Sequence, residues 1–138
     1  MTSSDSLTAP YTIEFPFDRT VGPTVGTFLG GLRDGQLWGV RTADGAVLCP
    51  VAEFDPGTGA ETGELVRLEP RGTVVSWTSG PTGAWALVNI DGTRGSFFHA
   101  IDAGDRAIAT GMRVQVRWRA ERVGDIKDIE CFEPEVTA

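Results

Sequence analysis

The sequence predicts a mainly β protein in which a helix and a short hairpin precede a closed five-stranded barrel. Turn-forming glycine and aspartate residues recur about every eight to twelve residues, a spacing typical of short strands joined by tight turns. The runs between these turns are rich in Val, Ile, Phe and Trp, which favour strands. At 138 residues, 41% of them hydrophobic, the chain is long enough for one domain with a buried core. The predicted turns are Asp34-Gly35, Asp44-Gly45, 57–59, 80–83, Asp91-Gly92 and Gly124-Asp125.

One helix is predicted between Gly22 and Gly35, ahead of the strands. Pro23 can occupy its first position and Gly35 can end it. Apolar residues at i, i+3, i+4 and i+7 form one stripe along this helix. The residues of the stripe are Val25, Phe28, Leu29 and Leu32.

Three glycines, Gly22, Gly26 and Gly30, repeat every four residues beside that stripe. An interior glycine costs a helix about 1 kcal/mol relative to alanine. Two interpretations stay open: another backbone approaches the helix closely at these positions, or the segment is short and partly irregular and its glycines merely end turns.

Residues 40–56 (VRTADGAVLCPVAEFDP) predict a hairpin that resembles one knuckle of a zinc ribbon. A structural zinc site needs four Cys or His ligands, which ribbons supply as paired knuckles. Here only Cys49 could remain as a ligand, because neither the turn at 42–45 nor the one at 55–59 holds a thiol. We therefore expect no metal. The hairpin should instead be held by its own apolar residues, Val47, Leu48, Val51 and Phe54.

Five strands are predicted after the hairpin, with a segment long enough for one helical turn between the third and the fourth. This layout is that of an OB-fold barrel. The strands are expected at approximately Leu65 to Thr78, Ala84 to Ile90, Ser96 to Ile101, Met112 to Trp118 and Ile126 to Phe132.

The predicted strands differ in the polarity of their two faces. The strand at 112–118 alternates cleanly between apolar and polar residues, so one face is buried and the other is wet. By contrast, 96–101 and 85–88 are apolar on both faces. Because a small barrel encloses only one face, we expect the other to be covered by the helix and hairpin in part, and by a partner protein for the rest.

The chain is divided here into a flexible tail (1–10), the helix with its degenerate ribbon hairpin (11–63), the barrel (64–134) and a short tail (135–138). Residues 1–9 lack the pattern of a signal peptide. No run approaches the roughly 18 apolar residues of a membrane span. We expect a cytoplasmic protein.

Composition limits the classes of partner and the state of the thiols. The net charge is −7, with 11 arginines and a single lysine, which argues against binding to a phosphate backbone. Cys49 and Cys131 lie far apart in the sequence. Without an export signal, two buried free thiols are expected.

The only histidine, His99, is the first candidate for catalysis. Ser96 and Asp102 each lie three residues away, so along one strand both would point to the opposite face. A hydrogen-bonded structural or interface histidine is the expectation. Cys49 has no basic neighbour except Arg41, which gives no support for an activated thiolate.

Arginines gather near the end of the chain. Arg113, Arg117 and Arg119 share one face of a predicted strand, and Arg122 follows. They form either a solvated outer face or a local site for an anion, such as an acidic patch on a partner or a coenzyme A phosphate. Arg71, at an Arg-Gly-Thr turn, is a second candidate of the same kind.

Several motifs follow one another in a distinctive order. The predicted helix ends in F-x-x-x-L-x-x-G-x-L (28–37), then come EPRGTVVSWT (69–78) and DAGDRAIATGMRVQVRW (102–118). Over roughly residues 20–133, this order resembles the family of OB-fold proteins with an N-terminal rubredoxin-like zinc ribbon that accompany thiolase-like enzymes acting on coenzyme A thioesters. The chain departs from the metal-binding members by lacking the cysteine pairs.

The resemblance implies a non-catalytic accessory subunit of a thiolase-like acyl-CoA enzyme. Members with a degenerate ribbon look like the partners of lipid-transfer-protein-type thiolases in steroid side-chain degradation, where the partner performs a retro-aldol carbon–carbon cleavage. The resemblance implies no catalytic residue and no cofactor in this chain, and a coenzyme A thioester would be contacted only as the partner's substrate. The expected contacts with coenzyme A or partner are Arg71, Thr73, Trp77, Arg113 and Arg117, and the expected partner interface comprises Gly26, Phe28, Gly30, Trp85, Phe97 and His99.

An alternative from another class is an OB-fold module that binds single-stranded nucleic acid. Trp77, Trp85, Phe97 and Phe98 could then stack on bases. The net charge argues against this alternative, because no basic groove surrounds the aromatic residues.

Overall fold

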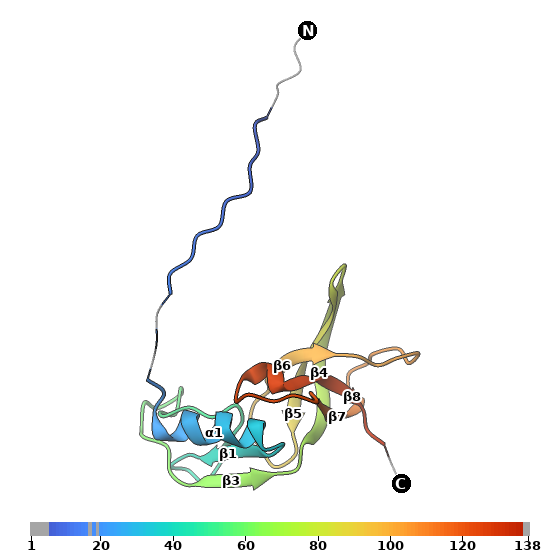
Figure 1. Ribbon diagram of the computed structural model, residues 1–138. Coiled ribbons are helices and arrows are strands. Elements are labelled where there is room, and N and C mark those ends of the chain that lie inside the picture. Colours follow the sequence, from blue (N-terminus) through green and yellow to red (C-terminus); the bar gives the residue numbers. More distant parts are fainter. Residues whose placement is uncertain (1–5, 17, 19, 137–138) are drawn as a thin grey trace.

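A computed structural model describes residues 6–16, 18 and 20–136 (Figure 1). In it, one helix and a small antiparallel sheet lie beside a closed five-stranded barrel, and residues 6–16 extend away from both. The predicted mainly β architecture with an OB-type barrel is therefore confirmed. The barrel consists of β4 (Arg71–Gly80), β5 (Gly83–Ile90), β6 (Phe97–Ile101), β7 (Arg113–Trp118) and β8 (Ile129–Pro134), in the order β4-β5-β6-β8-β7.

Helix α1 (Pro23–Arg33) begins and ends as predicted, with Pro23 in its first turn. Its N-cap residue, Gly22, has no side chain to accept the first backbone donors. Glu53, from the loop between β2 (Val47–Leu48) and β3 (Leu65–Leu68) of the small sheet, accepts them instead: its Oε1 lies 3.2 Å from the backbone nitrogens of both Thr24 and Val25. A negative charge at a helix N-terminus is also favoured by the helix dipole. The contact ties the loop to the helix.

The glycines within α1 and at its N-cap divide into two groups. A Cβ on Gly22 would collide with the Glu53 carboxylate, and one on Gly31 would collide with the indole of Trp38. Gly26 and Gly30 have open surroundings, where a Cβ would meet only side-chain atoms at 3.4 Å or beyond. Among the described residues, no backbone atom outside the helix comes within 4 Å of a Cβ built at these two positions, so the interpretation of close packing holds at neither of them.

The small sheet contains three antiparallel strands in the order β2-β1-β3: β1 (Leu37–Arg41), β2 (Val47–Leu48) and β3 (Leu65–Leu68). The single strand predicted at 65–78 is therefore wrong. It divides at Glu69-Pro70 into β3, which pairs with β1, and β4, which enters the barrel. Proline lacks the backbone N–H that a continuous strand would need at this point.

Two further expectations need correction near the end of the chain. Residues 102–112, between β6 and β7, form turns and irregular structure without the expected helical turn. Ile126–Asp128 form a short 3-10 helix, and β8 begins only at Ile129. The side chains of Asp125 and Asp128 cap this turn reciprocally, which competes with strand pairing.

A single hydrophobic core joins the helix to the barrel. Phe28 and Leu32 of α1 are buried together with the inward-facing residues of the strands. The alternation predicted for β7 is present: Val114 and Val116 are buried, and the arginine at 113 is exposed. The main strand residues of this core are Val74, Val88, Ile90, Phe97, Ile129 and Phe132.

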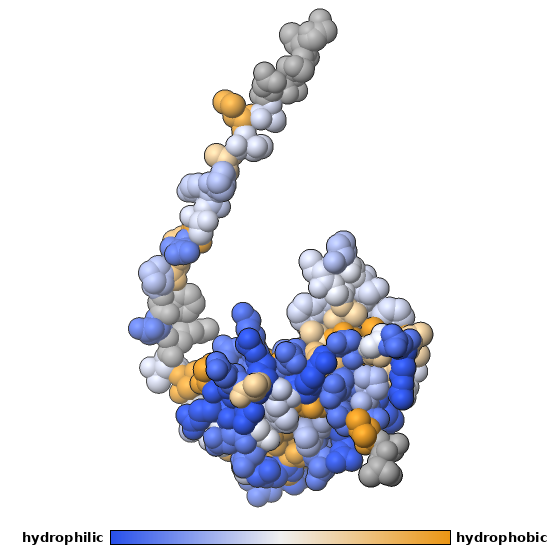
Figure 2. Space-filling view, turned by 45° about the vertical axis from the view of Figure 1, so that its right-hand side comes forward, coloured by the Kyte–Doolittle hydropathy of each residue, from blue (hydrophilic) through white to orange (hydrophobic). Residues whose placement is uncertain are grey.

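The outer face of β5 and β6 is not covered by the described part of the chain. Trp85 and Phe98 remain 40% and 57% exposed. The β4–β5 hairpin projects beyond the barrel (Figure 1), and apolar side chains gather at its base above a largely hydrophilic face (Figure 2). Among the described residues, no helix has both the length and the apolar character that crossing a membrane would require.

Candidate functional site

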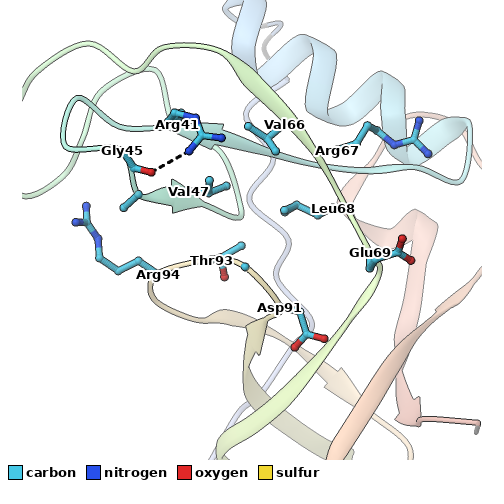
Figure 3. Close-up of a pocket in the computed structure, with 12 residues that line it drawn as sticks. Arg41, Gly45, Val47, Val66, Arg67, Leu68, Glu69, Asp91, Thr93 and Arg94 are labelled. Atoms are coloured by element: carbon cyan, nitrogen blue, oxygen red, sulfur yellow. Dashed lines mark hydrogen bonds between the residues drawn. The ribbon is translucent and has the colours of Figure 1, made fainter.

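A cleft lies between the small sheet and the loop after β5 (Figure 3). Its volume is about 600 Å³. Val47, Val66 and Leu68 supply its apolar lining, and the loop residues 91–94 close the opposite side. The cleft therefore forms where the ribbon-like sheet meets the barrel.

Most charged groups around this cleft have charged or polar partners within the chain, and Arg67 lies over the ring of Trp38. Arg41 donates to the carbonyl of Gly45 at 2.9 Å (Figure 3) and to the Glu64 carboxylate at 2.9 Å. The Asp91 carboxylate accepts hydrogen bonds from Nη1 and Nη2 of Arg113, each at 2.7 Å, and this contact lowers the pKa of Asp91. The described residues thus place no nucleophile with a base beside it in the cleft, and we find no constellation there that could perform acid–base chemistry.

Two turns, 42–45 and 55–59, correspond to the knuckles that were predicted for the ribbon-like hairpin. The first contributes Asp44 and the second contributes Asp55, and neither holds a thiol or an imidazole. Arg94 lies against both carboxylates, with Nη1 2.8 Å from Asp44 and Nη2 3.5 Å from Asp55. No group of three or more potential metal-ligating side chains occurs among the described residues. This donor set does not suit zinc, and a guanidinium bridges the knuckles.

Further hydrogen bonds hold each of these two turns. Thr42 donates to Asp44, and with the Arg94 contact this lowers the pKa of Asp44 to about 2. Asp55 is buried and accepts from the backbone of Gly57 at 2.8 Å. Of the apolar residues expected to hold the hairpin, Val47 is buried and Val51 packs against the core, but Phe54 is 56% exposed and does not contribute.

Both cysteines are buried free thiols, as predicted. Cys49 belongs to the hydrophobic core and to neither knuckle, which corrects its assignment as a remaining ligand position. Burial raises its pKa to about 12. Burial also raises the pKa of Cys131, although Arg117 donates to its sulfur at 2.8 Å and opposes the shift. Burial thus disfavours a nucleophilic thiolate at either position.

His99 lies on β6, and its side chain contacts the neighbouring strand β8 of the barrel. Its Nε2 donates to the carbonyl of Ile129 at 2.6 Å, and its ring lies edge-on to Phe97 and Phe132. No serine hydroxyl or carboxylate hydrogen-bonds the ring among the described residues. The predicted structural hydrogen bond is present.

The arginines proposed as anion contacts are held by carboxylates of the same chain. Arg113 pairs with Asp91 and with Glu135, the latter at 2.9 Å, and also donates to Thr73. Arg71 lies 3.3 Å from both Glu69 and Glu135. An incoming phosphate would have to compete with these pairs. Arg117 likewise has Asp102, Glu130 and Glu133 within 3.7 Å.

The residues expected at a partner interface are not brought together as one set. Phe28 and Phe97 are only 3% and 1% exposed, so both are core residues and offer no contact surface. Gly26 and Gly30 lie on α1, whereas Trp85, half-buried His99 and Trp77 lie in the barrel.

The sequence analysis missed three residues whose side chains hold helix ends, turns and loops in place: Glu53, Arg94 and Asp128. Each acts through partners distant in sequence or through backbone donors that no side-chain motif reveals. The only sequence signal is weak: Asp128 ends a G-D-x-x-D run, which is typical of a capped turn.

Comparison with known proteins reveals similarity at the level of structure. No family model matches the chain, and no curated protein matches its sequence. The chain is similar to a chain of the "Ltp2-ChsH2(DUF35) aldolase", with a TM-score of 0.59 and 17% identity over 86% of this chain and 100% of that one. It is also similar to a protein of unknown function from the DUF35 family of Sulfolobus solfataricus, with a TM-score of 0.56 and 17% identity over 69% of this chain and 78% of that one. At this identity the likeness concerns the fold.

Proposed function

We propose that this protein is a non-catalytic accessory subunit of a thiolase-like acyl-CoA enzyme. The observation that carries the proposal is a fold shared with a chain of the Ltp2-ChsH2(DUF35) aldolase along that chain's entire length. That similarity includes more than the barrel, because the barrel strands lie within residues 71–134 and the match covers 86% of this chain. We further propose that the partner is a lipid-transfer-protein-type lyase, which cleaves a steroid side chain by a retro-aldol reaction in the cytoplasm.

The chemistry of the described side chains supports a role without catalysis. The raised thiol pKa values disfavour a cysteine nucleophile. The imidazole of His99 donates to a backbone carbonyl and lacks the orienting acid of a general base. The catalytic groups would therefore come from the partner, and this subunit would cover the partner's site and order its loops.

In this proposal the small sheet is a ribbon that has exchanged its metal for Arg94. The guanidinium carries one positive charge and joins the two knuckles through Asp44 and Asp55. It would keep the ribbon in place as a rigid element without cysteines. We propose no cofactor for this chain, and a coenzyme A thioester would be bound by the partner.

The test uses the complex of this chain with the thiolase-like lyase encoded in the same genome, assayed with a steroid-type acyl-CoA aldol adduct. The lyase should be more active, or more stable, with this subunit than alone. His99→Ala should leave turnover within a small factor, whereas loss of a general base typically costs about 10²–10⁴-fold. Arg71→Ala should weaken assembly or substrate binding moderately. A loss of turnover by orders of magnitude in His99→Ala, with the complex intact, would make this a catalytic subunit and refute the proposal.

A further inference from the structure

The outer face of the barrel carries an apolar patch next to two cations that have no acidic partner among the residues the structure describes. The apolar patch comprises Trp77, Trp85, Leu87 and Phe98. Trp85 and Phe98 stack with ring centroids 5.6 Å apart and an interplanar angle of 15°. They line a cavity of about 170 Å³ together with Trp77 and Leu87. Three large aromatic side chains at one place, each at least 40% exposed, are unusual on a surface that functions alone.

A second cavity, of about 270 Å³, shares Trp85 with the first. Arg119 and Lys127 line it together with His99 and Glu130. The Glu130 carboxylate is engaged by Arg117 at 3.1 Å. Neither Arg119 nor Lys127 forms an ion pair within the described part of the chain, whereas Arg41, Arg71, Arg94, Arg113 and Arg117 all do. The second cavity thus offers positive charge directly beside the apolar patch.

The loop that carries both cations is firmly held. The backbone of Arg119 donates to the carbonyl of Asp128 at 2.9 Å, and the backbone of Lys127 donates to Asp125 at 2.8 Å. The buried carboxylate of Asp128 accepts three backbone donors from the same loop. The backbone under the cations is therefore ordered before anything binds, which lowers the entropic cost of recognition.

We infer that this surface, the apolar patch with Arg119 and Lys127, is where the proposed lyase partner docks. The inference rests on the proposed function. The occupant is a protein surface that places an aromatic or aliphatic side chain against Trp85 and Phe98 and an Asp or Glu carboxylate against the two cations. Charge complementarity selects this chemistry: in a chain of net charge −7, unpaired positive charge next to exposed aromatic residues is the unusual feature. Single-stranded nucleic acid fits less well, because two cations do not make a basic groove that tracks a phosphate backbone.

The experiment measures the Kd of the lyase for this chain by biolayer interferometry, once the complex has been isolated. Phe98→Glu and the double variant Arg119→Glu/Lys127→Glu should each raise Kd at least about tenfold, as expected at the centre of an interface. Phe54→Glu is the matched apolar control, because Phe54 is 56% exposed and Phe98 57%. Arg106→Glu, on the loop between β6 and β7, is the matched charge control. Both controls should leave Kd within about twofold.

The outcomes separate the two proposals. If the lyase forms no complex with the correctly folded chain, the proposed function is wrong, and the docking inference falls with it. If the complex forms and neither Phe98→Glu nor the double charge reversal weakens it, only the docking surface is wrong. A single-stranded oligothymidylate serves as a competing probe. Binding of this probe that Phe98→Glu abolishes, without an effect of the same variant on the lyase, would also overturn the inference.

Discussion

Replacing Asp128 by alanine should destabilise the protein through the loop between β7 and β8. The Asp128 side chain is almost fully buried, with 1% of the residue exposed. Its two oxygens accept backbone N–H groups from Val123 at 3.0 Å, Gly124 at 2.7 Å and Asp125 at 3.1 Å. Alanine leaves all three donors without this partner.

The expected loss is about 2–4 kcal/mol in the free energy of unfolding. A hydrogen bond to a charged group contributes about 1.5–3 kcal/mol, so three independent bonds would give a larger sum. Val123 and Asp125 are exposed, however, so water can replace the carboxylate at their donors. Gly124 is half-buried and lies against helix α1, where a Cβ would meet the carbonyl of Leu29 at 3.6 Å. Its lost bond should account for most of the effect.

Urea unfolding at pH 7, followed by tryptophan fluorescence, measures this loss. Asp125→Ala is the matched control, because it removes a side-chain acceptor of one donor, Lys127, from the same loop. The control should cost about 1 kcal/mol, the usual value for a lost cap. An Asp128→Ala variant that unfolds at the same urea concentration as the wild type would refute the reasoning.

The same contact predicts the pH dependence of the loss. Burial raises the pKa of Asp128, but its backbone donors outweigh burial, and the pKa lies below its ordinary value. A carboxyl group with a lowered folded-state pKa stabilises the fold fully above its unfolded pKa of about 4. This contribution is lost as the pH falls through the folded-state pKa. The stability difference between wild type and Asp128→Ala should therefore be constant from pH 7 to about pH 5 and shrink at lower pH. A difference that grows on acidification would contradict this sign.

Three further predictions concern the helix, the metal and the thiols. Gly30→Ala should stabilise the protein by about 0.5–1 kcal/mol, because the surroundings of Gly30 are open. Gly31→Ala should destabilise it by about 1–3 kcal/mol, because the new Cβ meets the Trp38 side chain. Equal urea midpoints for the two variants would refute the close packing at Gly31. Elemental analysis of the purified protein should find no stoichiometric zinc. About one zinc per chain, lost together with the fold in Cys49→Ser, would overturn the prediction that this hairpin binds no metal. The thiols of the native protein should react slowly with a disulfide reagent at pH 8, because both are buried and burial raises the pKa of Cys49 to about 12. Both thiols should react only after the protein unfolds. A fast reaction of the native protein would contradict their burial.

Local patterns were sufficient for much of the fold. The bounds of α1 follow from Pro23 at its start and from apolar residues at helical spacing, both of which act within a few residues of each other. The barrel strands follow from alternation and from turns such as Asp91-Gly92, whose glycine takes a positive φ of 85°. The failures were also local in origin: Pro70 divides a predicted strand, and Asp128 turns the start of another into a capped 3-10 helix.

Patterns could not decide which face of an apolar strand is buried. On β6, Phe97 and Phe98 are adjacent and identical in type, yet one is 1% exposed and the other 57%. The strand register assigns them, because Phe98 lies opposite Leu87 on the outside of the barrel. The sequence therefore predicted correctly that one face of this strand would lack cover, without identifying the residue that would be exposed.

The sequence by itself determined the type of fold, the helix and the absence of paired ligand cysteines. Only the tertiary structure decided which charges find partners. Arg94 meets Asp44 and Asp55, Arg113 meets Asp91 and Glu135, and Arg119 and Lys127 meet no carboxylate in the described chain. Periodicity reports which residues are apolar and where the chain turns, because those effects act between near neighbours. An ion pair depends on two side chains reaching within about 4 Å of each other, and for residues tens of positions apart that distance is set by how the small sheet and the barrel pack together.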